Sequence, residues 1–208
     1  MIITEFKRDK KHCFKVCTDD GKILFIDLDV CAEYGLKSGM EISEEKLKEI
    51  VKRSDFVRAK ERALWYLDRS DHSEKALYQK LTRAGFAESS CAAVMAWLKE
   101  YGMIDDQRYA ERLCERYSSS NISKRETYQK LLLKGVPRDI AKEVTAETEF
   151  DESAQIRAVS QKKYCNKLTD KKGVEKVYAA LIRKGFSFGA VRDELKQYLE
   201  EMQYISEE

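Results

Sequence analysis

The sequence contains a single proline, Pro137, among 208 residues. Sandwiches and barrels need many turn-forming residues between short strands, so this scarcity favours helices joined by short connections. No apolar run approaches the roughly 18 residues that a membrane-spanning helix requires, and the N-terminus lacks the long apolar core of a signal peptide. The sequence therefore predicts a cytoplasmic protein that makes no contact with a membrane.

Residues that hold metals are also scarce, because the six cysteines form no C-x-x-C pair and there are only two histidines. Cys13, Cys17 and Cys31 fall in one region, so a zinc site has to be considered. Structural zinc needs four well-spaced ligands, and His12 adjoins Cys13 on a predicted strand and should point to the opposite face. We interpret the cysteines as small buried side chains in a reducing compartment, and we expect no metal and no cofactor.

Catalytic constellations are equally hard to find. Asp105 and Asp106 could be read as paired catalytic carboxylates, but they follow Gly102 and precede a helical pattern. Carboxylates at a helix start stabilise free backbone amides, so we interpret them as a cap and first-turn residue. Neither histidine has a recognisable serine or cysteine partner, and there is no glycine-rich phosphate loop. The sequence predicts a protein that is not an enzyme.

Charge of one sign is not in excess: 39 basic and 37 acidic side chains give a net charge of +2. Bulk charge therefore does not indicate a nucleic-acid-binding protein, and any basic surface must be local. Charged residues nevertheless make up 37% of the chain. So much charge suits an elongated series of small helical units, whose surface is large relative to its core.

The first segment has the pattern of a small β unit. The runs His12–Thr18 and Lys22–Leu28 are rich in strand-forming residues, and the Asp20-Gly21 pair between them is a strong hairpin signal because glycine accepts a positive φ. Residues 2–8 could supply a third strand.

Short helical patterns follow this β unit. Asp29–Tyr34 predicts a short helix that Gly35 ends, and Ser43 is a good N-cap for a helix that runs to about Arg53. From Phe56 onward the whole pattern is helical.

A 50-residue repeat runs through this helical part. Glycines recur at 85, 135 and 185, each with a tyrosine seven residues before it and a leucine four residues before it. The tyrosine and leucine share one helical face, and the glycine is typical of the left-handed position that ends a helix. Two predicted helices precede each glycine and one follows it. The predicted helices are Phe56–Asp68, Ser73–Ala84 and Glu88–Tyr101; Asp105–Ser118, Ser123–Lys134 and Arg138–Glu147; and Asp151–Asn166, Asp170–Lys184 and Phe188–Gln203.

We therefore predict a mainly α fold: three tandem three-helix repeats in an elongated right-handed arrangement, preceded by a small N-terminal unit that contains a β-hairpin. The expected parts are an N-terminal β/α unit at 1–55, repeat 1 at 56–104, repeat 2 at 105–150 and repeat 3 at 151–208.

This helical part resembles the RecX family. The resemblance rests on an ordered series of motifs and extends over roughly residues 56–200. The motifs are Ala63-Leu64-Trp65-Tyr66-Leu67, Ser73, Lys80-Leu81, Gly85-Phe86, Trp97-Leu98, Asp105-Asp106 and Arg108-Tyr109-Ala110. The segment Tyr34–Ser43 is similar to the N-terminal extension of longer family members. Two departures leave the binding face open: Thr82 stands where the family usually has a basic residue, and the link 118–121 has fewer basic residues than expected, since it contains none.

The resemblance implies a regulator of the RecA recombinase. Such a protein binds RecA and its filament on single-stranded DNA, and it modulates, mostly by inhibition, the ATPase and strand exchange of the recombinase in DNA repair. We expect a monomer that binds free DNA only weakly, because affinity for phosphates scales with the cations engaged. An alternative is a helical-repeat DNA-binding module that acts independently of RecA, such as a helix-turn-helix-like regulator. A recognition helix with Arg, Asn or Gln massed at its start would favour the alternative, but the third helices start with Glu88-Ser89-Ser90 and Arg138-Asp139.

Basic side chains in the first two repeats are the candidates for contacts with DNA phosphates or an acidic face of RecA. Arg108, Arg112 and Arg116 recur every four residues and so share one helix stripe, although a solvated charged face is the other explanation. The candidates are Arg69, Lys75, Lys80, Arg83, Arg108, Arg112, Arg116, Lys124, Arg125, Lys130 and Lys134. We interpret the aromatic residues of the repeats as packing residues rather than as platforms for bases; they are Trp65, Tyr66, Tyr78, Trp97, Tyr128 and Tyr178.

Overall fold

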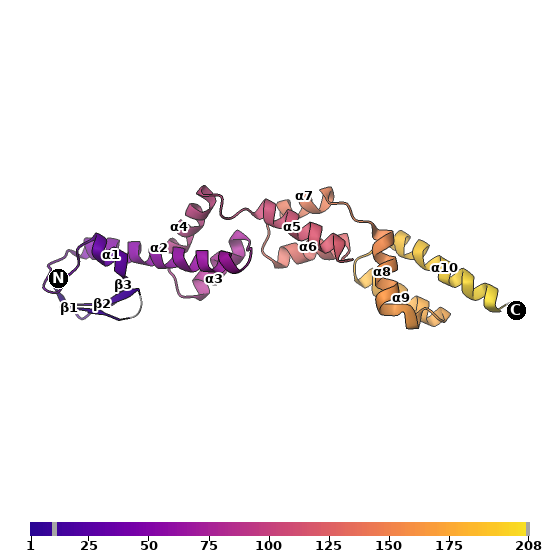
Figure 1. The fold of residues 1–208 in the computed structure, drawn as a ribbon, viewed down its shortest axis with the longest axis horizontal. Coiled ribbons are helices and arrows are strands. Elements are labelled where there is room, and N and C mark those ends of the chain that lie inside the picture. Colours follow the sequence, from indigo (N-terminus) through magenta and orange to yellow (C-terminus); the bar gives the residue numbers. More distant parts are fainter. Residues whose placement is uncertain (10–11, 207–208) are drawn as a thin grey trace. The chain divides into compact units, whose positions relative to one another are not determined.

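The computed structural model describes residues 1–9 and 12–206, which form a mainly helical chain with one small sheet at its N-terminal end (Figure 1). The residues divide into two compact units, Met1–Ile104 and Asp105–Glu208. The predicted fold class is thereby confirmed, while the elongated right-handed arrangement of the repeats stays a prediction.

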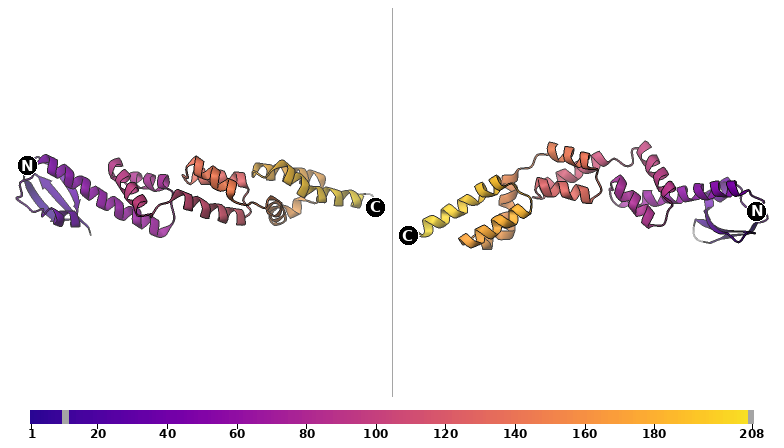
Figure 2. Two further views of the ribbon diagram at one scale, coloured as in Figure 1. Left: turned by 90° about the horizontal axis from the view of Figure 1, so that it is seen from above. Right: turned by 180° about the vertical axis from the view of Figure 1, so that it is seen from behind.

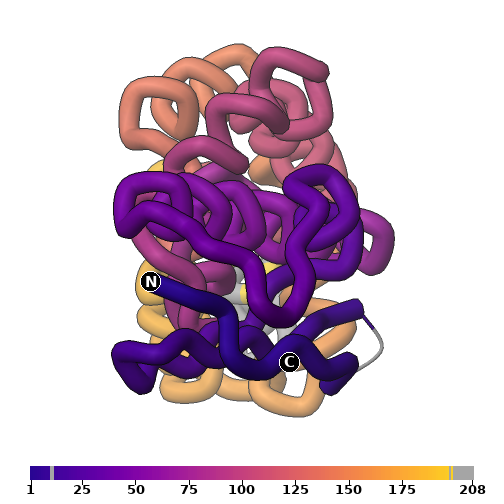
Figure 3. The backbone as a smooth tube through the Cα atoms, turned by 90° about the vertical axis from the view of Figure 1, so that its left-hand side faces the viewer, coloured from indigo at the N-terminus to yellow at the C-terminus, as the bar shows by residue number. Residues whose placement is uncertain are grey.

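The sheet has three antiparallel strands in the order β1-β2-β3. They are β1 (Ile3–Arg8), β2 (Cys13–Thr18) and β3 (Ile23–Asp27). Gly21 has a φ of +86° in the turn between β2 and β3, as the Asp-Gly signal predicts. Figures 2 and 3 show these strands in indigo at the start of the chain, and in Figure 2 the sheet lies alongside the beginning of the long helix that follows.

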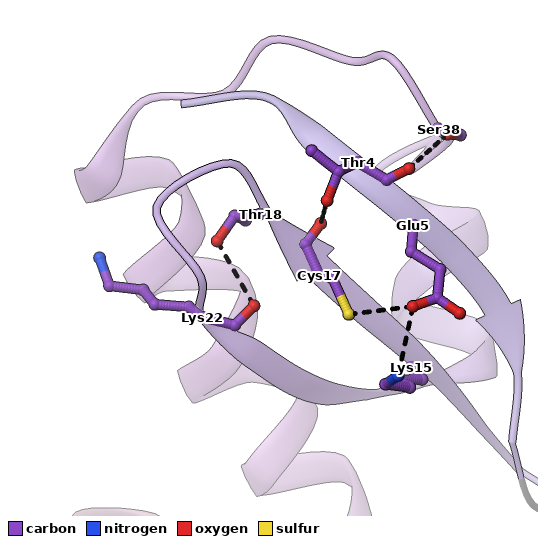
Figure 4. Close-up of polar contacts among 7 residues, drawn as sticks. All are labelled: Thr4, Glu5, Lys15, Cys17, Thr18, Lys22 and Ser38. Atoms are coloured by element: carbon purple, nitrogen blue, oxygen red, sulfur yellow. Dashed lines mark hydrogen bonds and ion pairs between the residues drawn. The ribbon is translucent and has the colours of Figure 1, made fainter.

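Polar contacts tie β1 to β2 on one face of the sheet (Figure 4). The Cys17 thiol donates to Glu5 Oε2 at 3.3 Å, and Lys15 Nζ lies 3.2 Å from the same oxygen. Hydrogen bonds from Cys17 and Lys15 hold the pKa of the Glu5 carboxyl below its ordinary value. Burial and the nearby carboxylate raise the pKa of Cys17. Cys17 is therefore a protonated structural thiol, not an activated nucleophile.

Two helices connect the sheet to the first repeat: α1 (Leu28–Glu33) and α2 (Glu44–Arg69). Ser43 caps α2 by accepting from Lys46 N at 3.2 Å, as predicted. The expectation that this helix ends near Arg53 is wrong, because α2 runs through 26 residues without a break. The expected division at residue 55 therefore falls inside one helix.

Ser54 explains why α2 continues. Its hydroxyl is buried and accepts a hydrogen bond from Asp27 N, at the end of β3, at 2.8 Å. The neighbouring Asp55 carboxylate accepts from Ala87 N at 3.1 Å. The two residues between the predicted helices thus accept hydrogen bonds from distant backbone amides, and the helix passes through them.

The remaining helices form the repeats at the expected places. Their bounds lie within two residues of the predicted ones, except that the last helix runs to Ser206 instead of the predicted Gln203. Repeat 1 consists of the second half of α2 with α3 (Glu74–Arg83) and α4 (Glu88–Glu100). Repeat 2 consists of α5 (Asp106–Ser119), α6 (Lys124–Leu133) and α7 (Arg138–Glu147). Repeat 3 consists of α8 (Glu152–Tyr164), the short 3₁₀ turn η1 (Cys165–Lys167), α9 (Lys171–Arg183) and α10 (Phe188–Ser206).

The repeat glycines end the middle helix of each repeat. Gly85, Gly135 and Gly185 have φ values of +89°, +87° and +88°, which confirms the predicted left-handed caps. The leucine four residues before each glycine is fully buried; these are Leu81, Leu131 and Leu181. Each leucine belongs to the hydrophobic cluster of its own repeat.

In the second unit, repeat 2 is seated directly on repeat 3. The Ser123 hydroxyl, which caps α6, also donates to Lys184 O at 2.6 Å. A Cβ built on Gly185 would lie 2.9 Å from both Arg125 Cβ and Ser123 Oγ. Gly185 therefore ends α9 and also leaves the space into which the start of α6 packs.

Candidate nucleic-acid and partner interface

In repeat 1, two cations from two helices gather around one tyrosine. Tyr66 lies near the C-terminal end of α2, and Lys80 of α3 places its Nζ 4.8 Å from the centre of the Tyr66 ring. The Arg62 guanidinium lies 5.9 Å from the same centre. We call Arg62, Tyr66 and Lys80 the Tyr66 cluster. These distances are within the range of cation–π attraction.

Repeat 2 contains a similar cluster, in which only the lysine stands at the equivalent position of the repeat: Tyr66 and Tyr117 are 51 residues apart, and Arg62 and Arg116 are 54 apart. Arg116 of α5 and Lys130 of α6 lie 5.4 and 5.9 Å from the centre of the Tyr117 ring. Lys130 also pairs with Glu126 at 3.3 Å. We call Arg116, Tyr117 and Lys130 the Tyr117 cluster. Lys80 and Lys130 are 50 residues apart, and the corresponding position in repeat 3 is Ala180.

Two other candidates from the sequence lie elsewhere, and a third, Arg69, adjoins the Tyr66 cluster through Trp65. Lys124 donates to Ala146 O near the end of α7 at 3.4 Å, and Arg125 lies beside the Gly185 backbone. The Arg69 guanidinium stacks on Trp65 at 3.5 Å. Within repeat 2 the structure therefore does not gather all the basic candidates at the Tyr117 cluster. The remaining candidates are exposed on α3, α5 and α6 or at their ends: Lys75, Arg83, Arg108, Arg112 and Lys134.

Trp65 contradicts its interpretation as a packing residue, because 44% of its surface is exposed. The other tyrosines and tryptophan of that group do pack against the repeat cores, as predicted. Sequence reasoning also missed Arg58 as a candidate, although Arg58, Arg62, Trp65 and Arg69 have the spacing of a single helical face. This helical spacing could have identified Arg58 as a candidate from the sequence.

The cysteine interpretation is confirmed in part. Cys31, Cys91 and Cys114 are buried, and burial raises the pKa of Cys31 to about 11. Cys13 and Cys17 are half-buried and Cys165 is exposed, so the expectation of burial is wrong for these three residues. In the described part of the chain, no three His, Cys, Asp or Glu side chains come together in a way that could hold a metal ion.

Asp105 occupies the predicted cap position. Its Oδ1 accepts from Arg108 N at 3.0 Å at the start of α5, so this carboxylate is engaged by the backbone. Among the described helices, none has both the length and the apolar character that crossing a membrane requires.

The comparisons with known proteins agree on one family. Residues 59–98 match the family model described as RecX, first three-helix domain. A regulatory protein RecX of Clostridioides difficile is 30% identical over 95% of this chain and 96% of its own length. One of Clostridium perfringens strain SM101 is 29% identical over 89% of this chain and 91% of its own length.

Solved structures support the fold. A crystal structure of a regulatory protein RecX matches with a TM-score of 0.68 at 21% identity, covering 94% of this chain and 98% of that one. A RecX structure from Lactobacillus salivarius matches with a TM-score of 0.61 at 21% identity, covering 70% of this chain and 97% of that one. The extent and identity of the match to the Clostridioides relative show that this chain belongs to the RecX family of regulatory proteins.

Proposed function

We propose that this protein binds the RecA filament on single-stranded DNA and lowers its ATPase and strand exchange. The Tyr66 and Tyr117 clusters supply the contacts to the filament. The protein acts as a monomer, without catalysing a reaction, in the cytoplasm where the recombinase meets DNA.

The observation that carries this proposal is that a lysine at the equivalent position of two successive repeats meets an arginine at a tyrosine ring. In each, a lysine from the middle helix and an arginine from the first helix meet at a tyrosine ring. Repeat 3 has Ala180 where the lysine would be. Packing of the repeat core does not require this lysine, since repeat 3 forms its core without it.

The charge balance favours a composite partner over naked DNA. A net charge of +2 gives little long-range attraction to phosphates, and each phosphate that is neutralised adds affinity only through counterion release. Two local clusters can engage only a few phosphates or carboxylates. A filament presents protein and DNA together, so its combined contacts supply the affinity that either component alone lacks.

The test compares three targets for the fluorescently labelled full chain: RecA filaments assembled on oligo-dT with a slowly hydrolysed ATP analogue, RecA alone and oligo-dT alone. We expect filaments to bind at concentrations at least about tenfold lower than either component. Equal binding to oligo-dT with and without RecA would contradict the proposal and favour an independent DNA-binding module.

A further inference from the structure

We infer that α2 carries a stacking site for a base of single-stranded nucleic acid, centred on Trp65. The site is formed by a stripe of α2 and by a hollow between this helix, the sheet and the loop that follows α3. The inference rests on the proposed function in one respect, because a protein that works on the RecA filament meets single-stranded DNA there.

The stripe consists of Arg58, Arg62, Trp65 and Arg69, at spacings of four, three and four residues. Residues at these spacings lie on one face of a helix. The buried face of α2 is formed by other residues, such as Ala59 and Ala63. The stripe is thus an arginine-rich surface with a large, partly exposed indole at its centre.

A hollow of about 300 Å³ adjoins Trp65. This size is at the lower end of the range for small-ligand sites (~300–1,000 Å³). Trp65 and Phe86 supply aromatic walls, and Arg58 lies 6.0 Å from the centre of the Phe86 ring. The other lining residues are His12, Cys13, Asp27, Arg58, Glu61 and Arg62.

The charges that line the hollow favour a neutral group inside it. Arg58 and Arg62 are offset there by Asp27 and Glu61, and the Asp27 carboxylate is engaged by Asp29 N at 2.9 Å. An anion gains little in such a balanced site, whereas a nucleobase is uncharged and offers a flat face to the indole. The arginines of the stripe then meet the phosphates on either side of that base.

The two arginines next to Trp65 are held differently, which gives the base a way onto the ring. Arg69 stacks at 3.5 Å and also donates to Trp65 O at 3.2 Å. Arg62 lies 5.3 Å from the Trp65 ring centre, beyond stacking distance, and is shared with Tyr66. The base stacks on the part of the indole that Arg69 does not cover, Arg69 keeps its contact with the ring, and the Arg62 guanidinium pairs with a phosphate.

The experiment measures binding of a fluorescent 20-nucleotide oligo-dT to the full chain without RecA, at several salt concentrations. We expect Trp65→Ala to weaken binding about tenfold (about 1.4 kcal/mol) at every salt concentration, because stacking releases no counterions. Trp65→Phe should keep part of the affinity. Arg62→Ala should instead flatten the salt dependence by about 0.7 in log K per log salt, the value for one phosphate contact with a single strand.

A matched control is Phe188→Ala, which removes another exposed aromatic side chain, 67% exposed, from α10; its affinity should equal that of the parent. In a Trp97→Phe background, where Trp65 is the only indole, oligo-dT should quench the fluorescence.

Unchanged affinity of a folded Trp65→Ala protein would overturn the inference, even where RecA inhibition persists. Loss of RecA inhibition with unchanged oligo-dT affinity would also overturn it and would make this surface a protein contact. Weaker oligo-dT binding by Trp65→Ala supports it even in a protein that has no effect on RecA.

Discussion

The contact between repeats 2 and 3 predicts different costs for the same substitution at two glycines. Gly85 and Gly185 end equivalent helices with almost the same φ, +89° and +88°. A Cβ on Gly85 would meet nothing within 4 Å, whereas a Cβ on Gly185 would lie 2.9 Å from Arg125 Cβ and Ser123 Oγ. Alanine at either position therefore suffers the same backbone strain, but only alanine at 185 collides with a neighbouring repeat.

The magnitudes follow from these two terms. A residue with a Cβ in the left-handed conformation destabilises the folded state by about 1–2 kcal/mol. Replacing glycine also makes the unfolded chain less flexible, which stabilises the folded state by about 0.4–1 kcal/mol. Gly85→Ala should therefore lower the free energy of unfolding by about 1 kcal/mol. Overpacking adds about 1–3 kcal/mol, so Gly185→Ala should lower it by about 2–4 kcal/mol.

Urea unfolding can separate the two effects because both tryptophans, Trp65 and Trp97, lie in the first unit. Tryptophan fluorescence follows that unit, and far-ultraviolet circular dichroism follows all helices. Gly185→Ala should shift the dichroism transition while leaving the fluorescence transition in place, and Gly85→Ala should shift the fluorescence transition. An equal loss of unfolding free energy for the two substitutions would refute the close packing of the start of α6 against Gly185.

Further predictions concern caps, thiols and the core. In a urea titration, Ser123→Ala should lower the free energy of unfolding by about 2–3 kcal/mol, because it removes a helix cap and the hydrogen bond to Lys184 O. Ser43→Ala removes only an exposed cap and should lower it by about 1 kcal/mol. At pH 8 an alkylating reagent should modify the exposed Cys165 rapidly and Cys31 hardly at all, as measured by mass spectrometry, because burial raises the Cys31 pKa to about 11 and leaves little thiolate. The labelling rate of Cys31 should rise as the pH approaches that value. Equal labelling rates of the two cysteines at pH 8 would contradict the burial of Cys31. Leu181→Ala should cost about 2–5 kcal/mol in the dichroism transition, since this side chain is fully buried in the core of repeat 3.

Local signals were sufficient to predict most of the fold. The left-handed conformation of Gly135 and the Asp20-Gly21 turn depend only on the backbone preferences of these residues and their neighbours in the sequence. Caps such as Ser123 are equally local, because the hydroxyl reaches an amide three residues away.

The break that was predicted in α2 was wrong for a non-local reason. Ser54 and Asp55 lie between the two predicted helices, and their side chains accept from Asp27 N and Ala87 N, which lie 27 and 32 residues away. Sequence spacing carries no information about such pairs.

The site was predicted less well than the fold. The clustering of basic residues in the first two repeats selected Lys124 and Arg125, which contact the end of α7 and the Gly185 backbone instead. It passed over Arg62, which reaches two aromatic rings. Helical spacing shows which residues share a face of one helix, but the meeting of Lys80 with Tyr66 depends on how two helices pack.

The central claim, that the Tyr66 and Tyr117 clusters act on the recombinase filament, is tested most directly by the DNA-dependent ATPase rate of RecA with added protein. The double variant Lys80→Glu with Lys130→Glu should need at least about tenfold more protein for half inhibition, because each reversal replaces attraction by repulsion. The control, Lys172→Glu with Lys176→Glu, makes the same change in net charge on exposed positions of repeat 3 and should inhibit like the parent. Inhibition by the folded Lys80/Lys130 variant at the parent's concentration would contradict the account.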